Sequence, residues 1–159
     1  MTERINYAQY APEAMETMYN LERYIARCYR ERSSFEKSLL DLIKLRVSQI
    51  NRCAFCIDMH TKEARAAGET EQRLYGLNAW REAPYYSDKE RAALAWAEAN
   101  TLIAGNDIDD TLYGETREHF SEVALIDLTL AITTINSWNR IARSFHTEAG
   151  HYKAGNIAF

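Results

Sequence analysis

Two cysteines and a histidine lie close together in the first half of this chain. Cys53 and Cys56 form a Cys-x-x-Cys pair, and His60 follows four residues after the second cysteine. Two thiols at this spacing can close into a disulfide or share a metal ion. On a helix, residues four apart lie on one face, so His60 can reach Cys56. Because the thiolate is the reactive form of a cysteine, this run is typical of a redox site with its own proton acceptor.

A helix that begins beside Asn51 would place both cysteines in its first turn. Asn51 is a favoured capping residue, and the unpaired N–H groups and the dipole at a helix start favour a negative charge. This argument favours Cys53 as the nucleophile, whereas the spacing to His60 favours Cys56. If the chain reverses near Asn51, Asp41 lies level with His60. Asp41 can then orient the imidazole in an Asp41–His60–Cys56 relay.

The same residues allow other interpretations. Structural zinc takes four ligands, of which this run supplies three, so a fourth would have to come from His119, His146, His151 or a carboxylate. We favour redox chemistry because no second Cys-x-x-Cys pair and no His-x-x-x-His pair is present. The cysteines can also belong to a redox sensor without turnover, or be inert in a structural oligomer. Phe55 and Met59 supply an apolar wall, which leaves open a small organic substrate other than peroxide.

The elements that position these residues are predicted to be helices. The chain has only 6 Gly and 2 Pro in 159 residues, which favours long helices and short turns. Apolar periodicity and capping residues predict helices over about 11–32, 34–51, 53–67, 70–80, 87–104, 109–119 and 121–141. No run predicts a strand and no linker divides the chain. We therefore expect one all-α domain over residues 1–159, a bundle of six to eight helices.

Two segments near the carboxyl end allow more than one interpretation. The last helix is apolar on more than one face, which is typical of a central helix or of a subunit interface. Within it, Trp138 is expected either in the core or, with Asn139 and Arg140, in the wall of a thiol pocket. The tail after Gly150 has no clear period. Such a tail is typical of a mobile segment or of one used in assembly.

Composition and charge argue against several classes of partner. The net charge of −4 and the pI near 5.6 give no electrostatic reason to expect nucleic acid or an acidic membrane. No apolar run approaches the roughly 20 residues that span a bilayer. The first residues lack the apolar core of a signal peptide, so we expect a cytoplasmic protein. In that compartment, three cysteines are more typical of catalysis or metal binding than of a disulfide scaffold.

The run from Asp41 to Cys56, followed by His60, resembles the alkylhydroperoxidase D-like (AhpD-like) branch of the carboxymuconolactone decarboxylase family. The likeness continues through 61–70, 90–96 and 136–140 and covers about residues 33–143. It implies an all-helical fold that assembles into homo-oligomers, either trimers or hexamers. It also implies an antioxidant enzyme that reduces a peroxide or exchanges a disulfide and is regenerated by an external thiol reductant. That cycle needs no organic cofactor and no metal.

The resemblance also assigns roles to four residues. The family's glutamate falls on Asp41, its two cysteines on Cys53 and Cys56, and its final histidine on His60. By this likeness Cys56 reacts with peroxide, and Cys53 resolves the resulting sulfenate to a disulfide. His60 takes and returns the proton, and Asp41 orients His60.

Three positions depart from the family pattern. Phe55 stands where the best-studied members have a histidine, and Asp41 is one methylene shorter than the family's glutamate. Arg52 replaces the glycine often found before the first cysteine. Its positive charge beside Cys53 can lower the pKa of that thiol and so partly replace the lost histidine.

Overall fold

The computed structural model describes residues 4–157, and every regular element in that part of the chain is helical. In chain order these are α1 (Tyr7–Tyr10), α2 (Pro12–Arg30), α3 (Lys37–Ile50), α4 (Ala54–Ala66), α5 (Glu71–Gly76), the 3-10 turn η1 (Leu77–Ala79), α6 (Asp88–Thr101), α7 (Asp110–Arg117) and α8 (Glu122–Ser144). The all-α class and the expected number of helices are confirmed. The short helix α1 was not predicted. Over the described range, no helix combines the length and apolar character needed to cross a bilayer.

Local signals in the sequence set most helix boundaries. Four predicted starts are confirmed, because a side-chain oxygen accepts a backbone N–H of the first turn at Thr70, Ser87, Asp109 and Ser121. At Ser87 the full capping box with Glu90 is formed. The predicted stop at Gly68 is also found, since its φ of 95° lies in the left-handed region that glycine adopts without strain.

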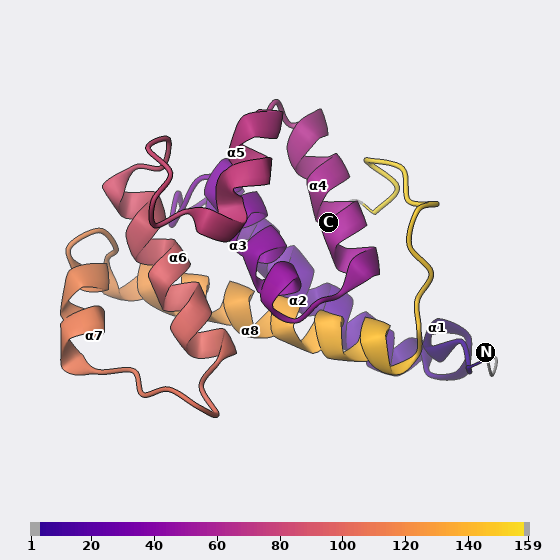
Figure 1. Cartoon of the computed structure of the whole chain (residues 1–159). Coiled ribbons are helices and arrows are strands. Elements are labelled where there is room, and N and C mark those ends of the chain that lie inside the picture. Colours follow the sequence, from indigo (N-terminus) through magenta and orange to yellow (C-terminus); the bar gives the residue numbers. More distant parts are fainter. Residues whose placement is uncertain (1–3, 158–159) are drawn as a thin grey trace.

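Helix α3 lies at the centre of the bundle and is packed by α4, α6 and α8 (Figure 1). Its buried apolar side chains are Leu39, Leu40, Leu42, Ile43, Leu45 and Val47. The long helix α8 also contacts α2, α4, α6 and α7, which agrees with a central position, one of the two alternatives for the last helix. Two of its apolar side chains, Val123 and Ile126, remain exposed near its start. Because α3 is covered on several sides, two of its charged residues, Asp41 and Lys44, are buried against its neighbours.

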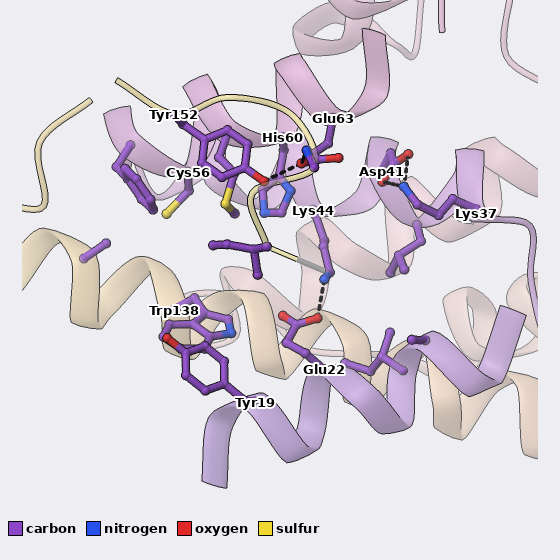
Figure 2. Close-up of a pocket in the computed structure, with 18 of the residues that line it drawn as sticks. Tyr19, Glu22, Lys37, Asp41, Lys44, Cys56, His60, Glu63, Trp138 and Tyr152 are labelled. Atoms are coloured by element: carbon purple, nitrogen blue, oxygen red, sulfur yellow. Dashed lines mark hydrogen bonds and ion pairs between the residues drawn. The ribbon is translucent and has the colours of Figure 1, made fainter. Parts of the chain in front are cut away.

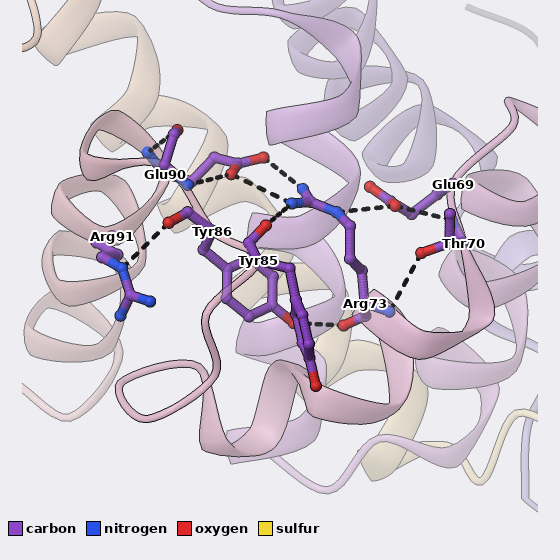
Figure 3. Close-up of polar contacts among 8 residues, drawn as sticks. Glu69, Thr70, Arg73, Tyr85, Tyr86, Glu90 and Arg91 are labelled. Atoms are coloured by element: carbon purple, nitrogen blue, oxygen red, sulfur yellow. Dashed lines mark hydrogen bonds and ion pairs between the residues drawn. The ribbon is translucent and has the colours of Figure 1, made fainter.

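A cluster around Arg73 holds α5 against the start of α6 (Figure 3). The Arg73 guanidinium donates to Glu69 at 2.9 Å and forms an ion pair with Glu90. It also donates to the carbonyl oxygen of Tyr85, while the Tyr86 hydroxyl donates to the carbonyl oxygen of Arg73. These polar groups therefore bind one another and stabilise the packing of α5 against α6.

The segment after α8 turns back along the bundle. Helix α8 ends at Ser144, and the following chain has no regular structure up to Ile157. It runs upward beside α4, the helix that carries the cysteines (Figure 1). As the lack of a helical period after Gly150 predicts, the described part of this segment is not helical. The segment nevertheless packs on its own chain, a contact that the sequence did not predict.

Candidate active site

The two cysteines lie at the amino-terminal end of α4. Cys53 is the N-cap residue and Cys56 lies in the first turn. In the structure they are joined by a disulfide, with their Cα atoms 5.3 Å apart. The prediction that Asn51 caps this helix is wrong, because α4 begins at Ala54 and Asn51 ends α3 instead. Cys53 itself therefore takes the position where the helix dipole favours a negative charge.

Asn51 has a different role, which is to tie the cysteine turn to α8. Its side-chain amide donates to the oxygens of Asn136 and Asn139, both at 2.9 Å. Asn139 in turn donates to the Ser48 hydroxyl at 3.0 Å, and the Arg143 guanidinium donates to the carbonyl oxygen of Asn51 at 2.9 Å. Sequence reasoning missed this network. The signal was available, because two asparagines interrupt the apolar pattern of α8.

The turn between α3 and the cysteines requires an unusual backbone. Arg52 has a φ of 54°, in the left-handed region that costs a residue with a Cβ about 1–2 kcal/mol. Glycine adopts this region without that cost. The backbone therefore gives a physical reason for the glycine of the family pattern at this position.

Cys56, His60 and Asp41 line one cavity of about 340 Å³ (Figure 2). Phe55, Met59 and Trp138 line the same cavity, so the expected apolar wall is found and Trp138 is part of it. Both sulfurs are covered, since Cys56 is 2% exposed and Cys53 is 1% exposed. A substrate must therefore enter this cavity to meet Cys56.

His60 is buried in the cavity without a partner. It is 6% exposed, and its Nε2 atom has no hydrogen bond. Burial, together with the positive charges of Lys44 and Lys37, holds the pKa of His60 well below its usual 6.5. The imidazole is therefore neutral at pH 7 and can accept a proton.

Asp41 is bound to a lysine rather than to the histidine. Both of its carboxylate oxygens accept from the Lys37 ammonium at 2.7 Å, and no hydrogen bond joins Asp41 to His60. Burial raises the pKa of Asp41, and the ion pair with Lys37 only partly offsets this effect. The structure thus places Asp41, Cys56 and His60 around one cavity, with Cys53 bonded to Cys56, but does not form the Asp41–His60 contact of the relay.

Two further polar contacts at the cavity were missed from the sequence. The Lys44 ammonium donates to the Glu22 carboxylate at 2.6 Å, and both side chains are buried. The Tyr152 hydroxyl donates to the Glu63 carboxylate. Figure 2 shows both contacts on either side of the His60 ring. The only hint of the first pair was a lysine inside the apolar run of α3, and nothing in the sequence indicated the second.

The zinc interpretation gains no support from the geometry. Within residues 4–157, no group of three or more His, Cys, Asp and Glu side chains is arranged to hold a metal ion. His151, one of the fourth ligands considered, is instead paired with Glu148 at the surface.

Comparisons with known proteins agree with this fold. The model of the carboxymuconolactone decarboxylase family matches residues 12–99. The uncharacterized protein YdfG of Bacillus subtilis is 49% identical over 142 residues, which is 89% of this chain and 93% of YdfG. A crystal structure of an Agrobacterium tumefaciens protein of unknown function, described as a candidate antioxidant defence protein AhpD, superposes with a TM-score of 0.86. That protein is 42% identical, and the match covers 95% of this chain and all of its own.

A more distant solved structure shares the fold alone. It is an uncharacterized peroxidase-related protein from Ralstonia eutropha, described as an alkylhydroperoxidase AhpD core, with 16% identity and a TM-score of 0.76. The match covers 91% of this chain and 74% of the other. The family match spans more than half of the chain and includes Asp41, both cysteines of the pair and His60. The chain therefore belongs to the carboxymuconolactone decarboxylase family, with an AhpD-like helical fold and a close Cys-x-x-Cys pair.

Proposed function

We propose that this protein is a thiol-dependent peroxidase that uses Cys53 and Cys56 as its redox pair. The observation that carries the proposal is a bonded cysteine pair beside a buried, unpartnered imidazole, with Cys56 and His60 in one cavity. The resemblance to AhpD-like proteins supports the same chemistry. An antioxidant role follows if the substrate is a hydroperoxide.

The proposed cycle begins with the reduced pair. His60 takes the proton of the Cys56 thiol, and the thiolate attacks the terminal peroxide oxygen. The O–O bond breaks, the proton passes from His60 to the departing alkoxide, and an alcohol leaves. Cys56 now carries a sulfenic acid. The Cys53 sulfur attacks the Cys56 sulfur, water leaves, and the disulfide forms. An external dithiol or two small thiols then supply two electrons and two protons to reopen it.

Three features support these roles. The low pKa of His60 keeps the imidazole neutral at pH 7 but makes it a weak base, so it takes the proton only as the Cys56 thiolate that forms beside it stabilises the imidazolium. Cys56 lines the cavity, whereas Cys53 does not, so Cys56 is placed to meet the substrate. Cys53 sits at the N-cap of α4, where the helix dipole favours the thiolate that resolves the sulfenic acid.

For Asp41 we propose an electrostatic role in the resting state. Its carboxylate neutralises Lys37, one of the two lysines whose charge lowers the pKa of His60. A direct Asp41–His60 contact would require the carboxylate to leave Lys37.

The test is the rate at which the reduced protein forms the disulfide with peroxide. Reduced protein is mixed rapidly with hydrogen peroxide or an organic hydroperoxide, and mass spectrometry follows the loss of two hydrogens. We expect a rate well above that of free cysteine, in the wild type and in Cys28→Ala, which removes the one cysteine outside the site. A rate equal to that of free cysteine would reject the peroxidase. Disulfide formation without turnover in the presence of a thiol reductant would indicate a sensor instead.

The assembly implied by the family resemblance stays a prediction. We propose a trimer or a hexamer, and light scattering of the purified protein measures its mass directly.

A further inference from the structure

The segment after Gly150 forms a strap that is bound to the outer side of α4. Lys62 donates to the carbonyl oxygens of Gly150 at 3.3 Å and Tyr152 at 3.0 Å, and the Gly150 N–H donates to Asp58 at 3.1 Å. The Gly155 N–H donates to Glu63 at 2.8 Å. Three charged side chains of the cysteine helix thus hold one irregular segment, here called the strap (residues 150–157).

Tyr152 is the aromatic residue of the strap that lines the cavity. Its ring lines the cavity and meets the Phe55 ring edge-on, with centroids 6.5 Å apart. Its hydroxyl donates to Glu63, the residue that also holds Gly155 (Figure 2). Burial and the contact with Glu63 raise the pKa of Tyr152 to about 12. The hydroxyl therefore stays protonated, and the bond that positions the ring persists across the physiological pH range.

The position of the strap makes it part of the substrate's binding surface. Cys56 is almost completely covered, so a substrate reaches its sulfur only within the cavity. Tyr152, Gly155 and Ile157 supply one wall of that cavity, and the other walls are helical. A substrate must therefore fit against Tyr152 while its reacting oxygen lies beside Cys56.

The charges around the cavity favour an uncharged substrate. The charged side chains that line it are three acidic and three basic: Glu22, Asp41, Glu63, Arg30, Lys37 and Lys44. Glu22 is paired with Lys44 and Asp41 with Lys37, so these four offer no spare charge to a ligand. Glu63 accepts from Tyr152 and Gly155, and the Arg30 guanidinium lies over the Tyr29 ring. An ionic group brought into this cavity would therefore lose its hydration and meet charged side chains that already have partners.

The remaining surface favours a compact apolar body with one hydroxyl-type group. Aromatic rings from Tyr19, Phe55, Trp138 and Tyr152 face the cavity. His60 is the side chain with an unsatisfied buried nitrogen. A neutral imidazole donates at one nitrogen and accepts at the other. An O–H group can satisfy Nε2 in either tautomer, because it both donates and accepts.

We propose that Tyr152 determines the specificity of this site, which selects an uncharged hydroperoxide with a compact, ring-sized apolar body over long-chain anionic hydroperoxides. The inference rests on the proposed function, since it names the substrate class of the same cavity. It adds a residue from outside the helical bundle to the cysteine site. The strap sets the size of the substrate, the paired charges reject ions, and His60 binds the oxygen.

The first test measures binding without turnover. The oxidised protein is titrated with 2-phenyl-2-propanol, the alcohol of a ring-sized hydroperoxide, and with the alcohol of a fatty-acid hydroperoxide. Tryptophan fluorescence reports occupancy, because Trp138 lines the cavity, and Trp138→Phe checks the source of the signal. We expect the ring compound to bind about tenfold more tightly in the wild type. Equal affinities would overturn the inference.

Substitutions then assign the selectivity to the strap. Tyr152→Ala should reduce the tenfold preference by weakening the binding of the ring compound, while the paired charges still disfavour the anion. Tyr152→Phe, which keeps the ring, should retain most of the preference. Lys153→Ala is the matched control, since this exposed neighbour on the strap does not line the cavity. A ring compound that binds Tyr152→Ala as tightly as the wild type would overturn the assignment.

The same variants separate this inference from the proposed function. With reduced protein, Tyr152→Ala should lower kcat/KM for cumene hydroperoxide about tenfold and leave hydrogen peroxide, which is too small to touch the ring, unchanged. If turnover is found but all variants treat both peroxides alike, Tyr152 is not the selector and the peroxidase stands. If selective binding is found without any peroxide reaction, the peroxidase fails and the ligand class of the cavity stands.

Discussion

Helix α3 lies between two regions that differ in the hydrogen bonding of their buried titratable side chains. On the α6 side, Glu98 accepts hydrogen bonds from Arg46 at 2.7 Å and from the Trp80 indole at 2.9 Å, and it pairs with Arg81. On the α4 side, His60 is equally buried but its Nε2 has no partner. Both groups are titratable and both lie on helices packed against α3. The Glu98 carboxylate has hydrogen-bond partners, whereas the Nε2 atom of His60 has none.

The pKa values follow the same division. Burial acts to raise the pKa of Glu98, but the bonds from Trp80, Arg81 and Arg46 together bring it below its usual value. The pKa of His60 is lowered because burial and two lysines disfavour its charged form. A buried polar atom without a partner costs about 1–3 kcal/mol. The difference separates a fully hydrogen-bonded group of the scaffold from an unbonded nitrogen that faces the cavity of the proposed active site.

The largest effect is expected from the cysteines themselves. Cys56→Ser should lower the peroxide reaction by at least about 10³-fold, because it removes the proposed nucleophile. Cys53→Ser should still react once and accumulate a sulfenic acid on Cys56, which dimedone labelling and mass spectrometry detect. A sulfenic acid that forms on Cys53 in the Cys56→Ser protein, with none in Cys53→Ser, would reverse the two roles.

The scaffold side of the comparison predicts a loss of stability without a loss of reactivity. Glu98→Ala removes the ion pair of the mostly covered Arg46 guanidinium and the acceptor of the buried Trp80 indole N–H, so we expect the free energy of unfolding to fall by about 3 kcal/mol. The rate of disulfide formation per folded molecule should not change. Urea unfolding and rapid mixing measure the two quantities.

Glu122→Ala is the control for that variant, because it removes an exposed glutamate that pairs with Arg117. It should change stability by less than about 1 kcal/mol. A slower peroxide reaction in Glu98→Ala at full folding would contradict the division between scaffold and site.

The parts that the sequence predicted are those governed by local spacing. Helix starts at Ser87 and Ser121 follow from capping residues, and the common face of Cys56 and His60 follows from a separation of four. The true partner of Asp41 is also four residues away, at Lys37, and the sequence contained that information. The predicted relay to His60 depends instead on an assumed hairpin that places the two residues at the same height.

The missed parts depend on segments that meet only after folding. The Glu22–Lys44 pair joins α2 to α3, and Glu63 meets Tyr152 across 89 positions of sequence. Neither contact has a periodic pattern, since each depends on how helices and the strap pack. The start of α4 was misplaced for a related reason. Asn51 is a good capping residue locally, but its amide is bound by Asn136 and Asn139 of α8.

Replacing His60 should have the opposite effect to Glu98→Ala, because it should lower the rate with peroxide without lowering the free energy of unfolding. His60→Leu removes the proton acceptor, so the rate of Cys56 with peroxide should fall by about 10²-fold. The same change removes a buried polar atom that has no partner, so the free energy of unfolding should stay equal or rise. A large loss of stability in His60→Leu would mean that His60 is part of the scaffold.

The smallest predicted effect is the contribution of His60 to the pH dependence of stability. Its folded pKa lies below its unfolded value near 6.5, so below that pH the unfolded chain binds a proton that the folded chain does not. The stabilisation is complete above pH 6.5 and is lost as the pH falls, with a limiting slope of about 1.4 kcal/mol per pH unit. Urea unfolding between pH 7.5 and 5.5 measures this slope.

Two variants show whether that slope belongs to the buried imidazole. His60→Leu should remove it, whereas His151→Gln should keep it, because the His151 side chain is 81% exposed and is solvated in folded and unfolded chains alike. Asp41 acts in the reverse sense, since its raised pKa makes the folded chain bind a proton more readily as the pH falls. Its contribution is common to the wild type and both variants, so the difference in slope isolates His60. If His60→Leu keeps the slope of the free energy of unfolding against pH, then the buried His60 imidazole does not cause it.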